Sequence, residues 1–417
     1  MLPESYFGCT HGHLPDLKLE SGSVSGQVDG WSRIELNNRV VKYLPEQNKV
    51  VLANGKEFTY KALVLAPGLN HSDSHIEGLH QMRQTHEMER VFVHMLDNKV
   101  TSERNYYHGY NHTNGDMICY SPQGPYKGEG TDFWALYYES FHRAQKTFGR
   151  AAAGSRIQYW TPNKHIFRFP YANEVALDEC HKRSIDVMFG WEMTKVHTSN
   201  IGEKIATFRN VDTGATIEKP FTHMNINPPS PPHKELIDAK LTDSSGMIDV
   251  NPYTLQHSRF DNIFAFGDAI KGETTRTQNA VYAQVPVVKN NLFRFMDGQE
   301  LNGIYDGFTY MPFYLSHSNA TCFQHLWDYE PAPKNHWAPN YGLFSNLYFR
   351  YQMSSNMKQN VAFAGMSKDH GPPYKHFTQT FDELEHNEYL LSHGVDIEAL
   401  RHIHPRRAPQ VAHAEHH

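Results

Sequence analysis

Short apolar runs and helix-spaced apolar stripes alternate along this chain, with polar turns between them. Residues 48–68 contain two strand-like runs joined by Asn54-Gly55, a dipeptide typical of a tight β-hairpin. The second run includes the apolar stretch 62–66, which predicts a strand buried on both faces. The chain therefore begins its regular pattern with strands.

Strands and helices then follow one another. Residues 116–145 have the pattern of strand, loop and helix, with Phe133, Leu136, Tyr137 and Phe141 on one helical face. Further predicted elements are a strand at 156–160, a helix at 171–183, a hairpin followed by a strand within 205–229, and a strand, loop and helix within 262–284. This alternation predicts an α/β fold with doubly wound parallel sheets.

Composition narrows the class of protein. A chain of 417 residues allows two or three domains of roughly 100–200 residues each. The formal net charge is −6 and no basic stripe dominates the sequence, so we do not expect nucleic-acid binding. The cysteines are widely spaced, with no CxxC pair, which disfavours a zinc knuckle or a disulfide-stapled secreted domain. They are Cys9, Cys119, Cys180 and Cys322.

Targeting signals and metal sites are not evident in the sequence. No apolar run reaches the ~18 residues that span a bilayer. The start, Met1 to Glu4, has neither a secretory nor an Arg-rich leader pattern, so any targeting signal is expected to be internal or removed earlier. His-x-His pairs occur at 11–13 and 402–404, but no nearby carboxylate or cysteine completes a ligand set. We therefore predict no metal site.

One aspartate stands at the tip of an apolar strand. The run Asn262 to Phe266 ends in Gly267-Asp268, and a predicted helix follows after a polar loop. One interpretation is that Asp268 caps this helix, because aspartate is a favoured N-cap. The other is that the carboxylate binds the ribityl chain of FAD while the helix N-terminus points at the cofactor.

The segments around this strand resemble the sulfide:quinone oxidoreductases, flavoproteins of the disulfide-reductase superfamily related to flavocytochrome c sulfide dehydrogenase. The resemblance covers roughly residues 30–330, in the right order and spacing. Its main segments are 42–68, 226–232, 246–268, 280–292 and 305–314. It implies a two-domain FAD/NAD(P)-binding, double Rossmann-like fold.

On this resemblance we predict five regions. Residues 1–110 are the remnant of an FAD-binding-like domain, 111–230 a second, NAD-like Rossmann-type domain, and 231–300 a return to the first domain. Residues 301–400 form an irregular, aromatic-rich C-terminal region, and 401–417 a solvated tail.

The phosphate-binding turn of these enzymes is not found in the sequence. Family members open with a strand, a GxGxxG turn and a helix that bind the FAD pyrophosphate. Here the only glycine-rich loop between a strand and a helix, 124–130, has a different spacing. We expect the first βαβ unit to lie on an absent segment, to lie on a separate polypeptide, or to be lost. Without its donors, burying the pyrophosphate charge is unfavourable.

The redox thiols of the resembled enzymes are also replaced. One normally follows a Pro-x-Lys and the other lies two residues after a Thr; here these positions are Gly128 and Met311. A thioether has no proton to lose and forms no disulfide. Cys119 and Cys322 lie near in sequence, and we interpret both as small buried hydrophobic residues. In addition, Pro67 removes a backbone N–H where the family commonly has Ala-Thr-Gly.

These departures predict a catalytically silent relative. We expect no catalytic residue, no required cofactor, and FAD binding through Gly267 and Asp268 only if flavin is retained at all. The resemblance implies a peripheral accessory subunit of a respiratory-chain complex at the mitochondrial inner membrane. The stretch 341–353 is expected either to pack on another subunit or to contact the membrane.

The alternative is an active FAD-dependent oxidoreductase linked to quinone or NAD(P)H. Its phosphate-binding unit would come from a missing segment or a partner chain.

Overall fold

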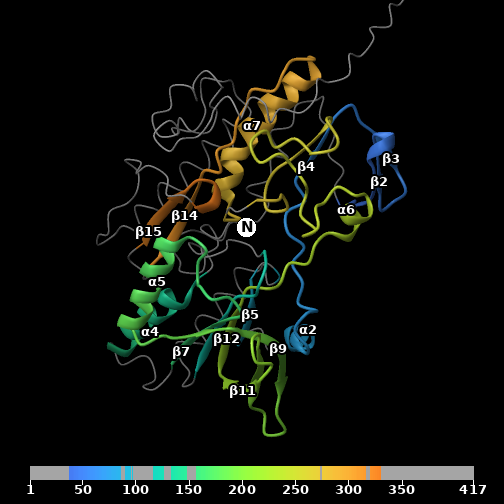
Figure 1. Ribbon diagram of the computed structural model, residues 1–417. Coiled ribbons are helices and arrows are strands. Elements are labelled where there is room, and N and C mark those ends of the chain that lie inside the picture. Colours follow the sequence, from blue (N-terminus) through green and yellow to red (C-terminus); the bar gives the residue numbers. More distant parts are fainter. Residues whose placement is uncertain are drawn as a thin grey trace, which may run out of the picture.

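The structure is a computed structural model, and the chain forms two bodies connected by two crossing segments and by a C-terminal hairpin (Figure 1). One body contains α6, α7 and the strands β1–β4; the other contains the parallel sheet with α4 and α5 against it (Figure 1). The described residues are 37–85, 90–94, 96, 116–125, 133–147, 156–272, 275–315 and 320–329.

The first body is built on two small sheets and a long helix. Its elements are β1 (Val40–Leu44), a 3-10 turn (Pro45–Gln47), β2 (Lys49–Leu52), β3 (Glu57–Thr59), β4 (Leu63–Leu65), α6 (Lys234–Asp238), β13 (Ile263–Ala265) and α7 (Gln278–Met296). The predicted hairpin at Asn54-Gly55 is confirmed, since β2 and β3 pair antiparallel and Gly55 takes the left-handed conformation (φ +82°) that favours glycine. β4 and β13, 198 positions apart, pair in parallel from Leu63↔Ile263 onwards.

The predicted two-sided burial of β4 is wrong. Leu65 is buried, but Val64 on the opposite face is 37% exposed. Within the described residues β4 pairs with β13 alone, so the strand lies at a sheet edge there, and Val64 shows that one of its faces is open.

The second body is a three-layer arrangement around a parallel sheet. Its strands are β5 (Val91–Val93), β6 (Met117–Tyr120), β7 (Ile157–Thr161), β8 (Asp186–Phe189) and β12 (His223–Ile226), in the order β5-β12-β6-β7-β8. The covering elements are α2 (Leu79–Gln84), α4 (Ala135–Thr147), α5 (Pro170–Lys182), and the antiparallel strands β9 (Trp191–Thr198), β10 (Lys204–Asn210) and β11 (Thr216–Phe221). The predicted parallel sheet and both predicted helices are confirmed.

Alternation along β5 shows how the two faces of this sheet are covered. Phe92 packs with α4 and α5 in one apolar cluster, whereas Val91 and Val93 pack with α2 and the β9–β11 meander in another. The sheet is therefore buried on both faces, as parallel sheets are.

Two segments cross between the bodies side by side. Residues 66–78 lead from β4 to α2, and residues 227–233 return from β12 to α6. Ser72 N–H donates to the Pro229 carbonyl at 3.0 Å, and the His71 ring bonds to the Ser230 hydroxyl at 3.1 Å. The chain thus leaves the first body, builds the second and comes back, which is the connectivity of a domain inserted into another.

After residue 300 the structure contains a hairpin that the sequence analysis did not predict. β14 (Thr309–Tyr314) and β15 (Ala320–His325) pair antiparallel, and a 3-10 turn follows at Trp327–Tyr329. Residues of the hairpin join the apolar cluster of α4 and α5, while Phe308 and Leu326 join the core of the first body. The hairpin therefore contacts both bodies. The predicted domain boundaries remain predictions.

Candidate functional site

The strand end Gly267-Asp268 is held by contacts to the following segment. Gly267 lies in the left-handed region (φ +87°), and its N–H donates to the Gln284 side-chain oxygen at 2.7 Å. Asp268 is half-buried, and its carbonyl accepts from Arg276 Nε at 3.0 Å. Contacts from α7 and the loop before it therefore fix the position of this turn.

The helix that follows is capped by a different residue. Thr277 is the N-cap of α7, and its hydroxyl accepts from Ala280 N–H at 3.3 Å. The same hydroxyl bonds to the Thr309 hydroxyl at 2.9 Å, and both side chains are buried. The interpretation of Asp268 as the helix cap is therefore wrong, because the polar loop separates it from the cap position.

The position of these groups fits one end of a flavin nucleotide. A parallel strand ends in Gly267-Asp268, and the N-terminus of α7 lies next to that end, an arrangement that favours a polar or anionic ligand group. Asp268 and the first turn of α7 would hold the ribityl and ring portions of FAD. The structure does not describe residues 1–36 or 126–130, so the phosphate-binding prediction lies outside the described residues.

Met311, at the second predicted redox position, is a core residue. It lies in β14 opposite Phe323, and none of its surface is exposed. Its apolar cluster includes Phe133, Phe313 and Phe323, with the Phe133 and Phe313 rings stacked at 6.3 Å. A thioether surrounded by aromatic rings is a typical packing residue. Gly128, the other predicted position, lies outside the described residues.

The two described cysteines with defined side chains belong to the same cluster. Cys119 in β6 and Cys180 in α5 are both free and buried. Burial raises the pKa of the Cys119 thiol strongly, and burial raises the pKa of Cys180 to about 12. A nucleophilic thiol needs the opposite shift. The interpretation of Cys119 as a small buried hydrophobic residue is confirmed; Cys322 lies in β15, and its side chain lies outside the description.

A buried polar network closes the carboxyl edge of the parallel sheet, and the sequence analysis missed it. His94 follows β5 and bonds to the Asn225 side-chain oxygen at 2.7 Å, while the Asn225 amide donates to the Tyr138 hydroxyl at 3.2 Å. Asn227 donates to the Ser121 hydroxyl at 2.8 Å. The signal was a polar residue directly after each apolar run. Ligands of such sheets bind at this edge, and here it is filled by side chains.

His94 is held neutral by its surroundings. Burial lowers the pKa of His94 to about 4, and the Asn225 bond opposes that shift only partly. The ring also stacks on Trp134 at 5.9 Å. At neutral pH His94 is therefore a neutral donor to Asn225 and a packing residue, rather than a charged group.

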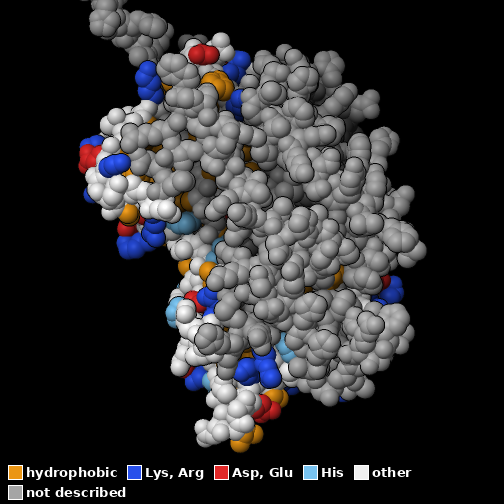
Figure 2. Space-filling model, turned by 180° about the vertical axis from the view of Figure 1, so that it is seen from behind, with side chains coloured by type: hydrophobic (Ala, Val, Ile, Leu, Met, Phe, Trp, Pro, Cys, Tyr) orange, Lys and Arg blue, Asp and Glu red, His pale blue; other side chains and the backbone are white. Residues whose placement is uncertain are grey.

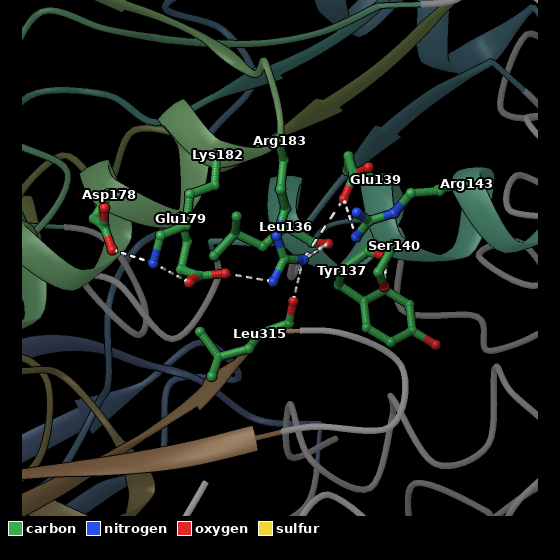
Figure 3. A network of polar contacts seen from close by, with 10 residues as sticks. All are labelled: Leu136, Tyr137, Glu139, Ser140, Arg143, Asp178, Glu179, Lys182, Arg183 and Leu315. Carbon is green, nitrogen blue, oxygen red and sulfur yellow. Dashed lines mark hydrogen bonds and ion pairs between the residues drawn. The ribbon is translucent and has the colours of Figure 1, made fainter. Parts of the chain in front are cut away.

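Arg183 ties the C-terminal hairpin to both helices of the second body (Figure 3). Its guanidinium donates to the carbonyls of Leu136 in α4 and Leu315 just after β14, at 3.3 and 2.5 Å. It also pairs with Glu179 at 2.6 Å and lies 3.6 Å from Glu139. Only 11% of the side chain is exposed. These contacts anchor the hairpin that carries Met311.

The described surface shows no dominant charge. On the side seen in Figure 2, Lys and Arg side chains are intermixed with Asp and Glu over the described part. In that part of the chain, no three His, Cys, Asp or Glu residues lie together as a metal site requires. None of the helices among the described residues combines the length and apolarity needed to cross a bilayer. The His-x-His pairs and the stretch 341–353 lie outside the described residues.

The fold and the strand-end site define the class of this protein as an FAD/NAD(P)-binding flavoprotein fold. No family model matches the chain. It is 26% identical over 303 residues to the mitochondrial sulfide:quinone oxidoreductase of Schizosaccharomyces pombe, over 72% of this chain and 64% of that protein. The chain thus spans less than two thirds of the length of this relative.

Two solved structures are similar. The sulfide:quinone oxidoreductase of Aquifex aeolicus superposes with a TM-score of 0.61 at 14% identity, covering 86% of this chain and 82% of that one, which is a likeness of fold. A chain in the cryo-EM structure of the Tetrahymena thermophila mitochondrial ATP synthase, an F1Fo composite tetramer model, gives a TM-score of 0.76 at 26% identity over 88% of each chain. The chain is thus similar in sequence to the sulfide:quinone oxidoreductases, as its sequence resemblance predicted.

Proposed function

We propose that this protein is a non-catalytic, sulfide:quinone oxidoreductase-like subunit of a mitochondrial ATP synthase assembly. The observation that carries the proposal is the match to a chain of the Tetrahymena thermophila complex, which covers 88% of both chains at 26% identity. The likeness to the Aquifex aeolicus enzyme is weaker in superposition and in identity. An accessory, peripheral place at the mitochondrial inner membrane is part of the same proposal.

Loss of the sulfur chemistry is supported by the environment of Met311. Sulfide oxidation in this family needs a thiolate or persulfide nucleophile. Met311 has neither, and it is enclosed by Phe313 and Phe323 in the core cluster. The buried thiols nearby, Cys119 and Cys180, have raised pKa values and remain protonated at neutral pH.

We propose that no flavin chemistry is required for this role. If FAD is retained, Asp268 and the first turn of α7 hold it, and the cofactor would supply electron acceptance. The chain's own residues there, Thr277 and Thr309, bond to each other and serve packing of the hairpin against α7. In this proposal the site is a structural remnant at the contact between the bodies.

Copurification tests the assembly role. The endogenous protein, tagged at one end, is isolated after mild detergent extraction and resolved by native electrophoresis with an in-gel ATP hydrolysis stain. The proposal expects the tag to comigrate with the ATP-hydrolysing band. A tag that migrates only as a free protein, with ATP synthase bands devoid of it, contradicts the proposal.

The alternative is an active FAD-dependent oxidoreductase, quinone or NAD(P)H linked. It is favoured by one observation, the position of Gly267-Asp268 at the end of a parallel strand and beside α7. The two functions separate on the purified protein: visible flavin absorbance together with quinone reduction supports the alternative, whereas a colourless protein without such turnover supports the structural role.

A further inference from the structure

A cavity of about 630 Å³ lies beside the segment that follows the strand-end site. Its walls come from the segment 249–258, from Lys271 and Gly272, and from Trp327 and Asp328. Neither Asp268 nor Met311 lines it. Its volume is within the roughly 300–1,000 Å³ typical of ligand pockets, so it holds a group larger than a bare ion.

The charges around this cavity sum to a negative value. Lys271 is paired with Asp249 at 3.3 Å and lies 4.0 Å from Asp243. Asp328 is exposed, and in the described part of the chain it has no hydrogen bond or ion pair. Burial lowers the pKa of His257, which keeps that ring neutral at neutral pH. Two lining carboxylates, Asp249 and Asp328, therefore accompany one lining ammonium, and the net negative charge of the lining favours a cation.

Aromatic rings complete the lining. The indole N–H of Trp327 donates to the Tyr305 carbonyl at 3.3 Å, and Tyr253 lies beside Asp328. Two glycines make room for the indole, since a Cβ on Gly272 would come within 2.6 Å of its ring and one on Gly307 within 2.2 Å of its backbone nitrogen. The ring is therefore fixed in place before any ligand arrives.

We propose that this cavity receives the guanidinium group of an arginine side chain from a neighbouring protein subunit. This inference rests on the proposed membership of an assembly. A guanidinium is planar, always charged and rich in donors, and it stacks on aromatic rings. It matches the carboxylate of Asp328 and the rings of Trp327 and Tyr253.

Saturation-transfer NMR on the full chain tests the proposal with N-acetyl-arginine amide as the probe and its citrulline counterpart as the uncharged isostere. The expected result is binding of the arginine compound, with citrulline at least about tenfold weaker. Asp328→Asn should weaken binding of the arginine compound by a similar factor. Since Asp328 has φ +56° and asparagine tolerates that conformation well, this variant keeps the fold.

Asp297→Asn, which alters an exposed carboxylate at the end of α7, is the matched control and should bind like the wild type. Equal binding of arginine and citrulline compounds, no binding of either, or full binding by Asp328→Asn overturns the inference. These outcomes are independent of copurification with ATP synthase, so failure here is distinguishable from failure of the proposed function.

Discussion

At the residue scale, the proposed loss of sulfur chemistry rests on Met311, whose thioether stands where the sequence resemblance predicts a thiol. Met311 is buried in an apolar cluster that includes Phe133, Phe313 and Phe323. An environment of this kind disfavours a thiolate, because burial disfavours the ionised form. The same effect raises the pKa values of Cys119 and Cys180 in this cluster.

A cysteine placed at position 311 should therefore be inert. We predict that Met311→Cys reacts with iodoacetamide in the native state as slowly as Cys119 and Cys180, and rapidly only after unfolding in urea. Asp212→Cys, in the exposed turn between β10 and β11, is the reactive control. Peptide mass spectrometry reports each site separately. Rapid native labelling at position 311 would show an open, reactive site and contradict the packing role.

At the element scale, the C-terminal hairpin is held to the second body by Arg183. This side chain spans α4, α5 and the end of β14, and it is largely buried. Removing one partner of a buried charged network leaves the remaining groups unsatisfied. The position of the hairpin therefore depends on the contacts of Arg183.

We predict that Arg183→Met lowers the free energy of unfolding by about 3 kcal/mol. The matched control is Lys182→Met, which removes exposed ion pairs to Asp178 and Glu179 and should leave the midpoint of unfolding unchanged. Urea denaturation followed by tryptophan fluorescence measures both. If the two variants unfold alike, Arg183 does not anchor the hairpin.

The elements show what the sequence could predict. Apolar periodicity and turn residues are local signals. They predict helices α4, α5 and α7, the turn at Asn54-Gly55 and the parallel strands. The hairpin β14–β15 has buried residues at Thr309, Met311 and Phe313, but the sequence between them contains Tyr310, Pro312 and Tyr314, so no polar alternation marks the strand. The His94–Asn225 bond and the Arg183 contacts to Leu136 and Leu315 join residues more than 40 positions apart, and a single sequence does not show which residues pair at such separations.

At the scale of the whole molecule, three buried histidines make stability depend on pH. Burial lowers the pKa of His94 and His325 to about 4 and that of His223 to about 3, from 6.5. Between pH 6.5 and about pH 4 these histidines are protonated in the unfolded chain but not in the native state, so the free energy of unfolding falls as the pH falls. Asp306 opposes this, because burial raises the pKa of its carboxyl from 3.8 to about 6.

We predict a loss of about 2 kcal/mol per histidine in the free energy of unfolding between pH 7 and pH 5. Asp306→Asn removes the opposing carboxyl and should make the loss steeper. Urea titrations at both pH values, on wild type and variant, check this. A free energy of unfolding that stays constant or rises on acidification would contradict the neutral burial of these histidines.

The most direct measurement for the whole account is sulfide-dependent quinone reduction by the natively isolated protein. It is assayed with added FAD and a soluble ubiquinone analogue, beside a sulfide:quinone oxidoreductase as positive control. The account predicts no sulfide-dependent reduction above the protein-free rate, because the position of the redox thiol is occupied by the buried Met311. Saturable turnover that scales with protein concentration would contradict it.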